Sequence, residues 1–276
     1  MSAVTPSVKL PRLEVTGRLA FHRVLLSEWT KLRSVRSTKW SLAVGFLLTI
    51  AFPVIFAFAT RSHWGSMSAS DRADRHPLDI ALAGVNVAQL AVAVLGVLLI
   101  TAEYGTGSIR STFTAVPKRL PVLWAKLIDY AAVCLALMVP AVLISFFVSQ
   151  TIVDSIPQLH ISFTQAGVAR SVLGGAVYVM LVGIFALAIG AIVRNTAGGI
   201  ATFAAIFFVI PPLMNILPTS WNNAISQYLP SNAGRSVFAL THDAHSLRPL
   251  PGILLFAGYC AVALAIAAVL LVRRDT

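Results

Sequence analysis

The chain has 276 residues, of which 57% are hydrophobic and only 11% are charged, and its formal net charge is +11. Nucleic-acid binding would require a soluble basic domain, which so apolar a chain does not offer, and we exclude this class of partner. Six apolar segments separate the basic residues, and each has the roughly twenty residues that a helix needs to cross ~30 Å of hydrocarbon. The sequence therefore predicts an all-α, multi-pass membrane protein.

The first 39 residues contain no apolar core of a signal peptide, and we expect none. Residues 1–16 have no periodicity and predict a mobile cytoplasmic tail. Apolar side chains recur at helical spacing within residues 17–39, with Trp29 on the apolar face and Lys31 and Arg33 on the polar one. This pattern predicts an interfacial amphipathic helix that contacts membrane lipids at the inner surface.

Glu28 interrupts the apolar face of this predicted helix. Its carboxylate can reach the membrane surface or pair with Lys31 or Arg33 along the same helix. Alternatively, it docks onto another helix or another chain. Both interpretations fit the sequence.

The six apolar segments predict six transmembrane helices within one domain of residues 40–272, followed by a cytoplasmic tail of residues 273–276. The loops between them are too short to hold an independent domain. His and Asp residues in the first outer loop match no metal-site spacing, so we expect no bound metal. The predicted spans are residues 40–60, 78–102, 128–149, 168–193, 197–217 and 252–272.

Few polar side chains lie inside the spans. All ten acidic residues lie outside the middle of the six segments, which argues against ion-coupled transport, because such transporters need an ionisable group or a broken helix near the midplane. Asn86 and Gln89, three residues apart in the second span, are the nearest to a buried polar pair. They predict either interhelical hydrogen bonds or a place in a substrate path.

The basic residues are distributed unequally between the two sides. Fifteen of the 21 Lys and Arg residues lie on one side, either before the first span or after the second, fourth and sixth spans. The other six lie on the opposite side. The positive-inside rule therefore predicts that both termini are cytoplasmic.

Sequence signatures of catalysis are missing. The chain has no GxxxxGK[ST] loop for ATP phosphates, no G-x-S-x-G elbow and no H-E-x-x-H zinc motif. It also lacks an acidic pair placed for general acid/base work in a membrane pocket. We expect a non-catalytic membrane subunit without a cofactor of its own.

The cytoplasmic loop after the second span has a distinctive pattern. The span ends in Glu103 and two glycines, of which Gly105 is expected to need the backbone freedom of glycine. A short amphipathic piece of residues 111–116 follows, and Pro117 stops it before basic residues lead into the third span. The segment is either an ordinary connection or a short helix on the inner face that docks a partner.

Five positions in this loop resemble the E-x-G-T and P-x-R elements that follow the second span in ABC-2 type transporter permeases: Glu103, Gly105, Thr106, Pro117 and Arg119. Residues 27–37, with the sequence SEWTKLRSVRS, also resemble the entry sequence of many bacterial permeases of this superfamily. The order of an interfacial helix, six spans, a cytoplasmic loop after the second span and a longer last outer loop is similar as well.

The resemblance implies the permease subunit of an ATP-driven exporter in the inner (cytoplasmic) membrane. A separate ATP-binding subunit would carry ATP and Mg, and a second permease chain, identical or related, would help to enclose the substrate path. The loop would form a coupling helix that meets the ATPase through Glu103, Gly105, Thr106, Gly107, Arg110, Pro117 and Arg119. The cargo is expected to be hydrophobic or amphipathic. The alternative is a non-transporting membrane anchor or regulatory subunit of a membrane complex.

Overall fold

A computed structural model describes residues 21–108, 119–240 and 246–273. Within these ranges the chain contains helices and turns but no strand. Six helical segments are long and apolar enough to cross a membrane, which confirms the predicted all-α chain with six candidate spans. These segments are Arg36–Ser66, Pro77–Gly105, Arg119–Val153, Val168–Val193, Thr196–Ile216 and Pro249–Arg273.

The α-helices follow one another with short connections. They are α1 (Phe21–Ser34), α2 (Arg36–His63), α3 (Ala69–Ala73), α4 (Pro77–Ala81), α5 (Ala83–Gly105), α7 (Arg119–Val153), α8 (Val168–Val193), α9 (Thr196–Ala204), α10 (Ile210–Leu213), α11 (Thr219–Ile225), α12 (Pro230–Arg235) and α13 (Pro249–Arg273). One π-helical turn, Ala205–Val209, joins α9 to α10. Short 3₁₀ turns are Trp64–Ser66, Pro157–Leu159, Met214–Ile216, Ser226–Tyr228 and Ser236–Phe238.

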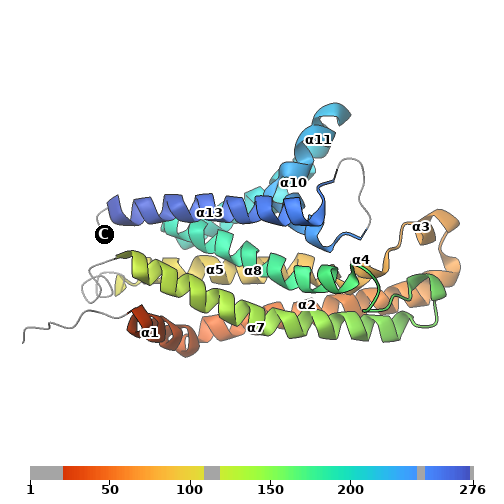
Figure 1. Cartoon of the computed structure of the whole chain (residues 1–276), viewed down its shortest axis with the longest axis horizontal. Helices are drawn as coiled ribbons and strands as arrows, with labels where there is room; N and C mark the ends of the chain where they lie inside the picture. Colours follow the sequence, from red (N-terminus) through yellow and green to blue (C-terminus); the bar gives the residue numbers. More distant parts are fainter. Residues whose placement is uncertain (1–20, 109–118, 241–245, 274–276) are drawn as a thin grey trace, which may run out of the picture.

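The long helices α2, α5, α7, α8 and α13 run along the longest axis of the molecule (Figure 1). Helix α1 and the carboxyl end of α13 lie at one end, which we call the α1 end, and α3 and α4 lie at the other (Figure 1). Helix α8 is the centre of the bundle. In its apolar stretch 72% of the residues are buried, whereas in the apolar stretch of the fifth span only 17% are. Helices α10 and α11 project away from the bundle (Figure 1).

Small residues bring α5, α7 and α8 into close contact. A Cβ atom on Gly96 of α5 would overlap the backbone carbonyl of Gly183 on α8. A Cβ atom on Gly183 would overlap the phenol ring of Tyr130, which comes from α7. In lipid, association of helices depends on such close packing rather than on a hydrophobic force between them. The three helices therefore form a tight core.

Arginines at the α1 end cap the last turn of α13. Arg194 Nη2 donates a hydrogen bond to the carbonyl of Leu270 at 3.0 Å, and Arg119 Nη1 donates to the carbonyl of Leu271 at 2.9 Å. The last four carbonyls of a helix have no partner within it, so these bonds satisfy two of them. Arg194 has a left-handed backbone with φ 57°, and it forms the tight turn from α8 into α9 together with Asn195.

Several helix boundaries differ from the predictions, and two of these differences bear on the site. Helix α7 begins at Arg119, whereas the predicted span begins at residue 128. The prediction was short because Lys126 and Asp129 lower the local hydropathy, although they do not interrupt the helix. The predicted helix of residues 17–39 divides at Val35, whose extended backbone has φ −76° and ψ 120°. Residues 17–20 and the predicted tails, residues 1–16 and 274–276, lie outside the described ranges.

Candidate functional site

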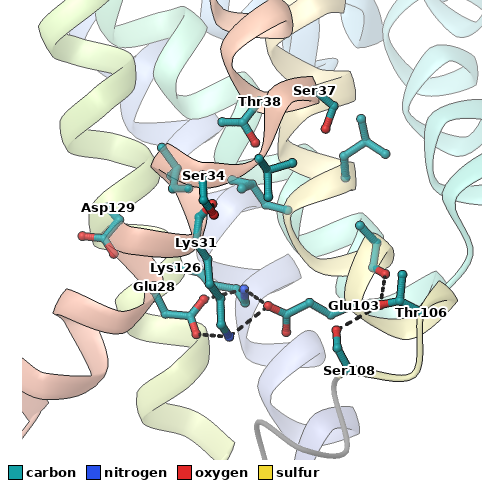
Figure 2. A pocket seen from close by; sticks show the side chains of 15 residues that line it. Glu28, Lys31, Ser34, Ser37, Thr38, Glu103, Thr106, Ser108, Lys126 and Asp129 are labelled. Atoms are coloured by element: carbon teal, nitrogen blue, oxygen red, sulfur yellow. Dashed lines mark hydrogen bonds and ion pairs between the residues drawn. The ribbon is translucent and has the colours of Figure 1, made fainter.

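Four charged side chains meet at the α1 end of the bundle (Figure 2). Lys31 Nζ of α1 contacts Glu28 Oε1 at 2.7 Å and Glu103 Oε1 of α5 at 3.1 Å. Lys126 Nζ of α7 contacts Glu28 Oε2 at 2.6 Å and Glu103 Oε1 at 2.7 Å. Each lysine thus binds both glutamates, and three helices are joined. We call Glu28, Lys31, Glu103 and Lys126 the ionic cluster.

Burial makes this pairing obligatory. Only 3% of the Glu28 side chain and 6% of the Lys126 side chain are exposed. A buried charge costs several kcal/mol unless it is paired and hydrogen-bonded. The two carboxylates and two ammonium groups balance, so the ionic cluster is formally neutral.

The cluster accounts for the position of Glu28 on the apolar face of α1. The buried stripe of this helix consists of Val24, Glu28 and Leu32. Val24 packs against Val122 and Ala125 of α7, which brings Glu28 towards Lys126. Glu28 therefore pairs within its own helix and also docks onto another helix, so both interpretations of the sequence are realised in one carboxylate.

Lys31 lies outside the candidate spans and is partly exposed. Burial lowers the pKa of its ammonium group, but hydrogen bonds and Coulomb attraction from Glu28 and Glu103 outweigh this effect. The pKa of Lys31 is therefore raised above its ordinary value. At neutral pH this side chain carries its positive charge.

A pocket of about 470 Å³ opens beside the ionic cluster, between α1, α2, α5 and α7. Leu32, Leu98 and Leu99 supply apolar walls. The ionic cluster and Asp129 supply charge (Figure 2). Glu103 Oε2 and Asp129 Oδ2 are buried, and neither has a hydrogen-bond partner among the described residues. The pocket therefore contains buried acceptors that are available to a donor.

The predicted coupling segment is only partly described. Arg110, Pro117 and residues 111–116 lie outside the described ranges. Thr106 directly follows α5, and its hydroxyl donates to the carbonyl of Ala102 at 2.9 Å.

The expectation that Gly105 needs the freedom of glycine is wrong. Gly105 is the last residue of α5, and it is not among the glycines with positive φ. Gly107 has φ 70°, in the left-handed region that favours glycine, so the required flexibility lies two residues later.

Other predicted residues lie outside the ionic cluster. Trp29 and Arg33 are exposed on α1. Arg119 donates to α13.

Of the two amides of α5, Gln89 contacts α8. Gln89 Nε2 donates to the carbonyl of Asn86 at 2.9 Å, and Gln89 Oε1 accepts from the hydroxyl of Tyr178 at 2.5 Å. Asn86 Oδ1 is buried and has no hydrogen-bond partner among the described residues. Glu103 lies about 20 Å from Gln89 along the axis of α5, since a helix rises 1.5 Å per residue. The amides and the ionic cluster are therefore separate sites.

Sequence reasoning missed Lys126 and Asp129 as site residues. Lys126 precedes the predicted third span, residues 128–149, and Asp129 is its second residue, and the sequence predicts no role for either. The available signal was a pair of opposite charges three residues apart within the apolar stretch of residues 120–130. Such a pair inside a candidate span predicts a buried, partnered position.

Metal binding is not supported in the part of the chain that the structure describes, where no three His, Cys, Asp or Glu side chains are grouped to hold an ion. The site consists of paired charges and a pocket, which suit docking, mechanical connection and ligand binding. No protein-family model matches this sequence, and no curated protein matches it.

Proposed function

We propose that this chain is the permease subunit of an ABC-2 type, ATP-driven exporter, which forms the substrate path and couples at its α1 end to a separate ATP-binding subunit. Both termini would face the cytoplasm, and ATP and Mg²⁺ would bind to the partner. A second permease chain would complete the path. The observation that carries the proposal is the ionic cluster, which joins α1, α5 and α7 on both sides of the loop that the resemblance assigns to coupling.

A docking loop transmits force only if its two ends are held by the spans. Glu103 lies two residues before the end of α5, and Lys126 lies seven residues after the start of α7. Their 2.7 Å ion pair connects the two helices that flank the loop. Glu28 and Lys31 add α1 to the same connection, so a load on the loop would move three helices together.

Helix α5 extends this connection into the bundle. It packs against α8 through Gly96, and Gln89 bonds to Tyr178 of α8. A displacement of α5 at the α1 end would therefore be transmitted to α8 in the core of the bundle. This continuity supports a loop that transmits movement from the ATPase to the bundle, rather than a loop that only connects two helices.

The alternative proposal is a membrane anchor or regulatory subunit that binds its partner at the same surface. The ionic cluster would also stabilise such a docking site. The two functions differ in whether partner binding drives movement of a solute across the membrane, so transport must be measured together with association.

The test uses Glu103→Gln, with the exposed Asp154→Asn as a matched control. The chain is purified from its native membranes, its associated ATPase is identified, and the pair is reconstituted into vesicles. We expect no ATP hydrolysis by the chain alone and ATP-dependent solute movement by the pair. Glu103→Gln should weaken association or stimulated hydrolysis by 5- to 150-fold, the range of about 1–3 kcal/mol that is typical of coupling.

Three outcomes would decide between the functions. ATP turnover by the chain alone, or a native complex that contains no ATPase, would contradict the exporter. Association with an ATPase without any ATP-dependent transport would favour the regulatory subunit. Equal coupling in Glu103→Gln and Asp154→Asn would show that the ionic cluster does not transmit the load.

A further inference from the structure

The pocket at the α1 end has a charge imbalance that the ionic cluster does not remove. The ionic cluster is neutral, because two lysines share two glutamates. Asp129 lines the same pocket, only 6% of it is exposed, and its Oδ2 atom has no hydrogen-bond partner among the described residues. In Figure 2 Asp129 stands apart from the ionic cluster and makes no marked contact. The described lining therefore carries one excess negative charge.

The burial of Asp129 makes this charge informative. It lies near the start of the predicted third span, residues 128–149, and only 6% of it is exposed. An ionisable side chain inside a transmembrane helix is costly, and such residues usually have a functional partner. A cation bound in the pocket would supply that partner.

The remaining walls define the rest of the ligand. Leu32 of α1 and Leu98 and Leu99 of α5 supply apolar surface. A volume of about 470 Å³ lies within the range of small-molecule sites. Glu103 Oε2 offers a second buried acceptor for an N–H or O–H group. Inorganic cations would leave the apolar walls unused, and an anion would face the excess negative charge.

We propose that this pocket binds an amphipathic organic cation, with its ammonium group at Asp129 and its apolar body against Leu32, Leu98 and Leu99. The ligand is either a soluble lipophilic amine or the ammonium headgroup of a phosphatidylethanolamine lipid, which share this chemistry. The inference goes beyond export, since it concerns binding by this chain alone and needs no ATPase. Its failure would leave the proposed function open to its own test.

The experiment measures equilibrium binding of tritiated octylamine to the full chain in phosphatidylcholine nanodiscs at pH 7.5. The amine is then a cation, because an alkylammonium group has a pKa of about 10.4. Empty nanodiscs correct for partition into lipid, and unlabelled octanol and octanoate test the requirement for charge. We expect saturable binding that unlabelled octylamine displaces at least tenfold better than either control compound.

Two variants locate the site. Asp129→Asn removes the charge at nearly constant volume, and Ala102→Trp fills the pocket from an exposed position of α5. Each should weaken octylamine binding at least tenfold, whereas Asp154→Asn, at a side chain that is 73% exposed, should remain within twofold of the wild type. Unfolding midpoints establish that the variants are folded, and Ala102→Trp decides alone if Asp129→Asn is not.

Nanodiscs that contain phosphatidylethanolamine separate the two sources of the ligand. A weaker apparent affinity for octylamine in these discs would assign the pocket to the lipid, and an unchanged affinity would assign it to a soluble amine. The proposal is overturned if the wild type shows no saturable binding in phosphatidylcholine discs, or if a folded Asp129→Asn or Ala102→Trp variant binds octylamine with wild-type affinity.

Discussion

At the scale of single residues, Lys126 is a buried charge that joins two helices at the α1 end. Its ammonium group lies between two carboxylates from different helices, with only 6% of the side chain exposed. Removing one partner of a buried ion pair leaves the other charge without compensation, which is usually worse than removing both. The stability of this end should therefore respond strongly and non-additively to changes in the ionic cluster.

Lys126→Met should lower the free energy of unfolding by about 3–5 kcal/mol, because Glu28 stays buried with only the half-exposed Lys31 as its partner. The exposed Lys39→Met is the matched control and should cost less than about 1 kcal/mol. Adding Glu28→Gln to Lys126→Met should recover part of the loss, since the uncompensated carboxylate is then removed. Denaturant unfolding in detergent measures all four proteins, and equal stability of the two single variants would contradict the prediction.

Lys31 should make stability fall at alkaline pH. Its folded-state pKa is raised, so its contribution is fully present below the unfolded-state value of about 10.4 and is lost as pH rises through the folded-state pKa. Because 40% of the side chain is exposed, we expect less than about 1 kcal/mol. Lys31→Arg stays charged in this range, so its unfolding midpoint should decline less than the wild type above pH 10.5. Parallel curves between pH 8 and pH 12 would exclude a role for Lys31 titration.

At the scale of elements, the bundle depends on the contact between α5, α7 and α8. The Tyr130 hydroxyl of α7 crosses Gly183 of α8 and donates to the carbonyl of Val92 on α5 at 3.2 Å. One side chain thus contacts all three helices. This contact requires a position on α8 without a Cβ atom.

Gly183→Ala should destabilise the protein by about 1–3 kcal/mol, because the added methyl group overlaps the Tyr130 ring in a packed core. Gly258→Ala on α13 is the control, since a Cβ atom there would meet no atom within 4 Å. The control should be neutral or slightly stabilising in a helix. Thermal unfolding of both purified variants is the measurement. A Gly183→Ala midpoint that matches that of Gly258→Ala would show that Tyr130 moves aside without cost.

At the scale of the whole molecule, the even number of candidate spans returns the chain to the end where it began. Helix α1 and the carboxyl end of α13 lie at the same end of the molecule (Figure 1). The α1 end also carries Arg119 and Arg194, which bind the last carbonyls of α13. Two of the basic residues at this end thus cap a helix, in addition to counting in the charge distribution from which the orientation is predicted.

Cysteine labelling in intact cells should test the orientation. An impermeant maleimide should label three exposed positions, Ser66→Cys and Gln158→Cys at the end opposite α1 and Ser220→Cys on α11. It should not label the exposed His22→Cys on α1. Ser231 is unsuitable because only 2% of it is exposed. The native Cys134 and Cys260 are buried and should stay unlabelled. Labelling of His22→Cys alone would reverse the topology.

The sequence alone determined the helical class and the six candidate spans, because both depend on local properties. A helix in lipid satisfies its backbone groups within itself, so twenty apolar residues suffice to predict it. The amphipathic pattern predicted a helix before the first span, and Glu28 stood out on its apolar face. Charged residues within a helix were less easily interpreted, and α7 was therefore predicted too short.

Only the tertiary structure decided which charges meet. Glu28 and Lys126 are 98 positions apart in the chain, and Lys31 and Glu103 are 72 apart. Their pairing depends on α1 packing beside α7 and on the end of α5 reaching the same level, which no local pattern encodes. Hydropathy and periodicity act along one helix, whereas the ionic cluster, the pocket and uncompensated Asp129 arise from the contacts between helices.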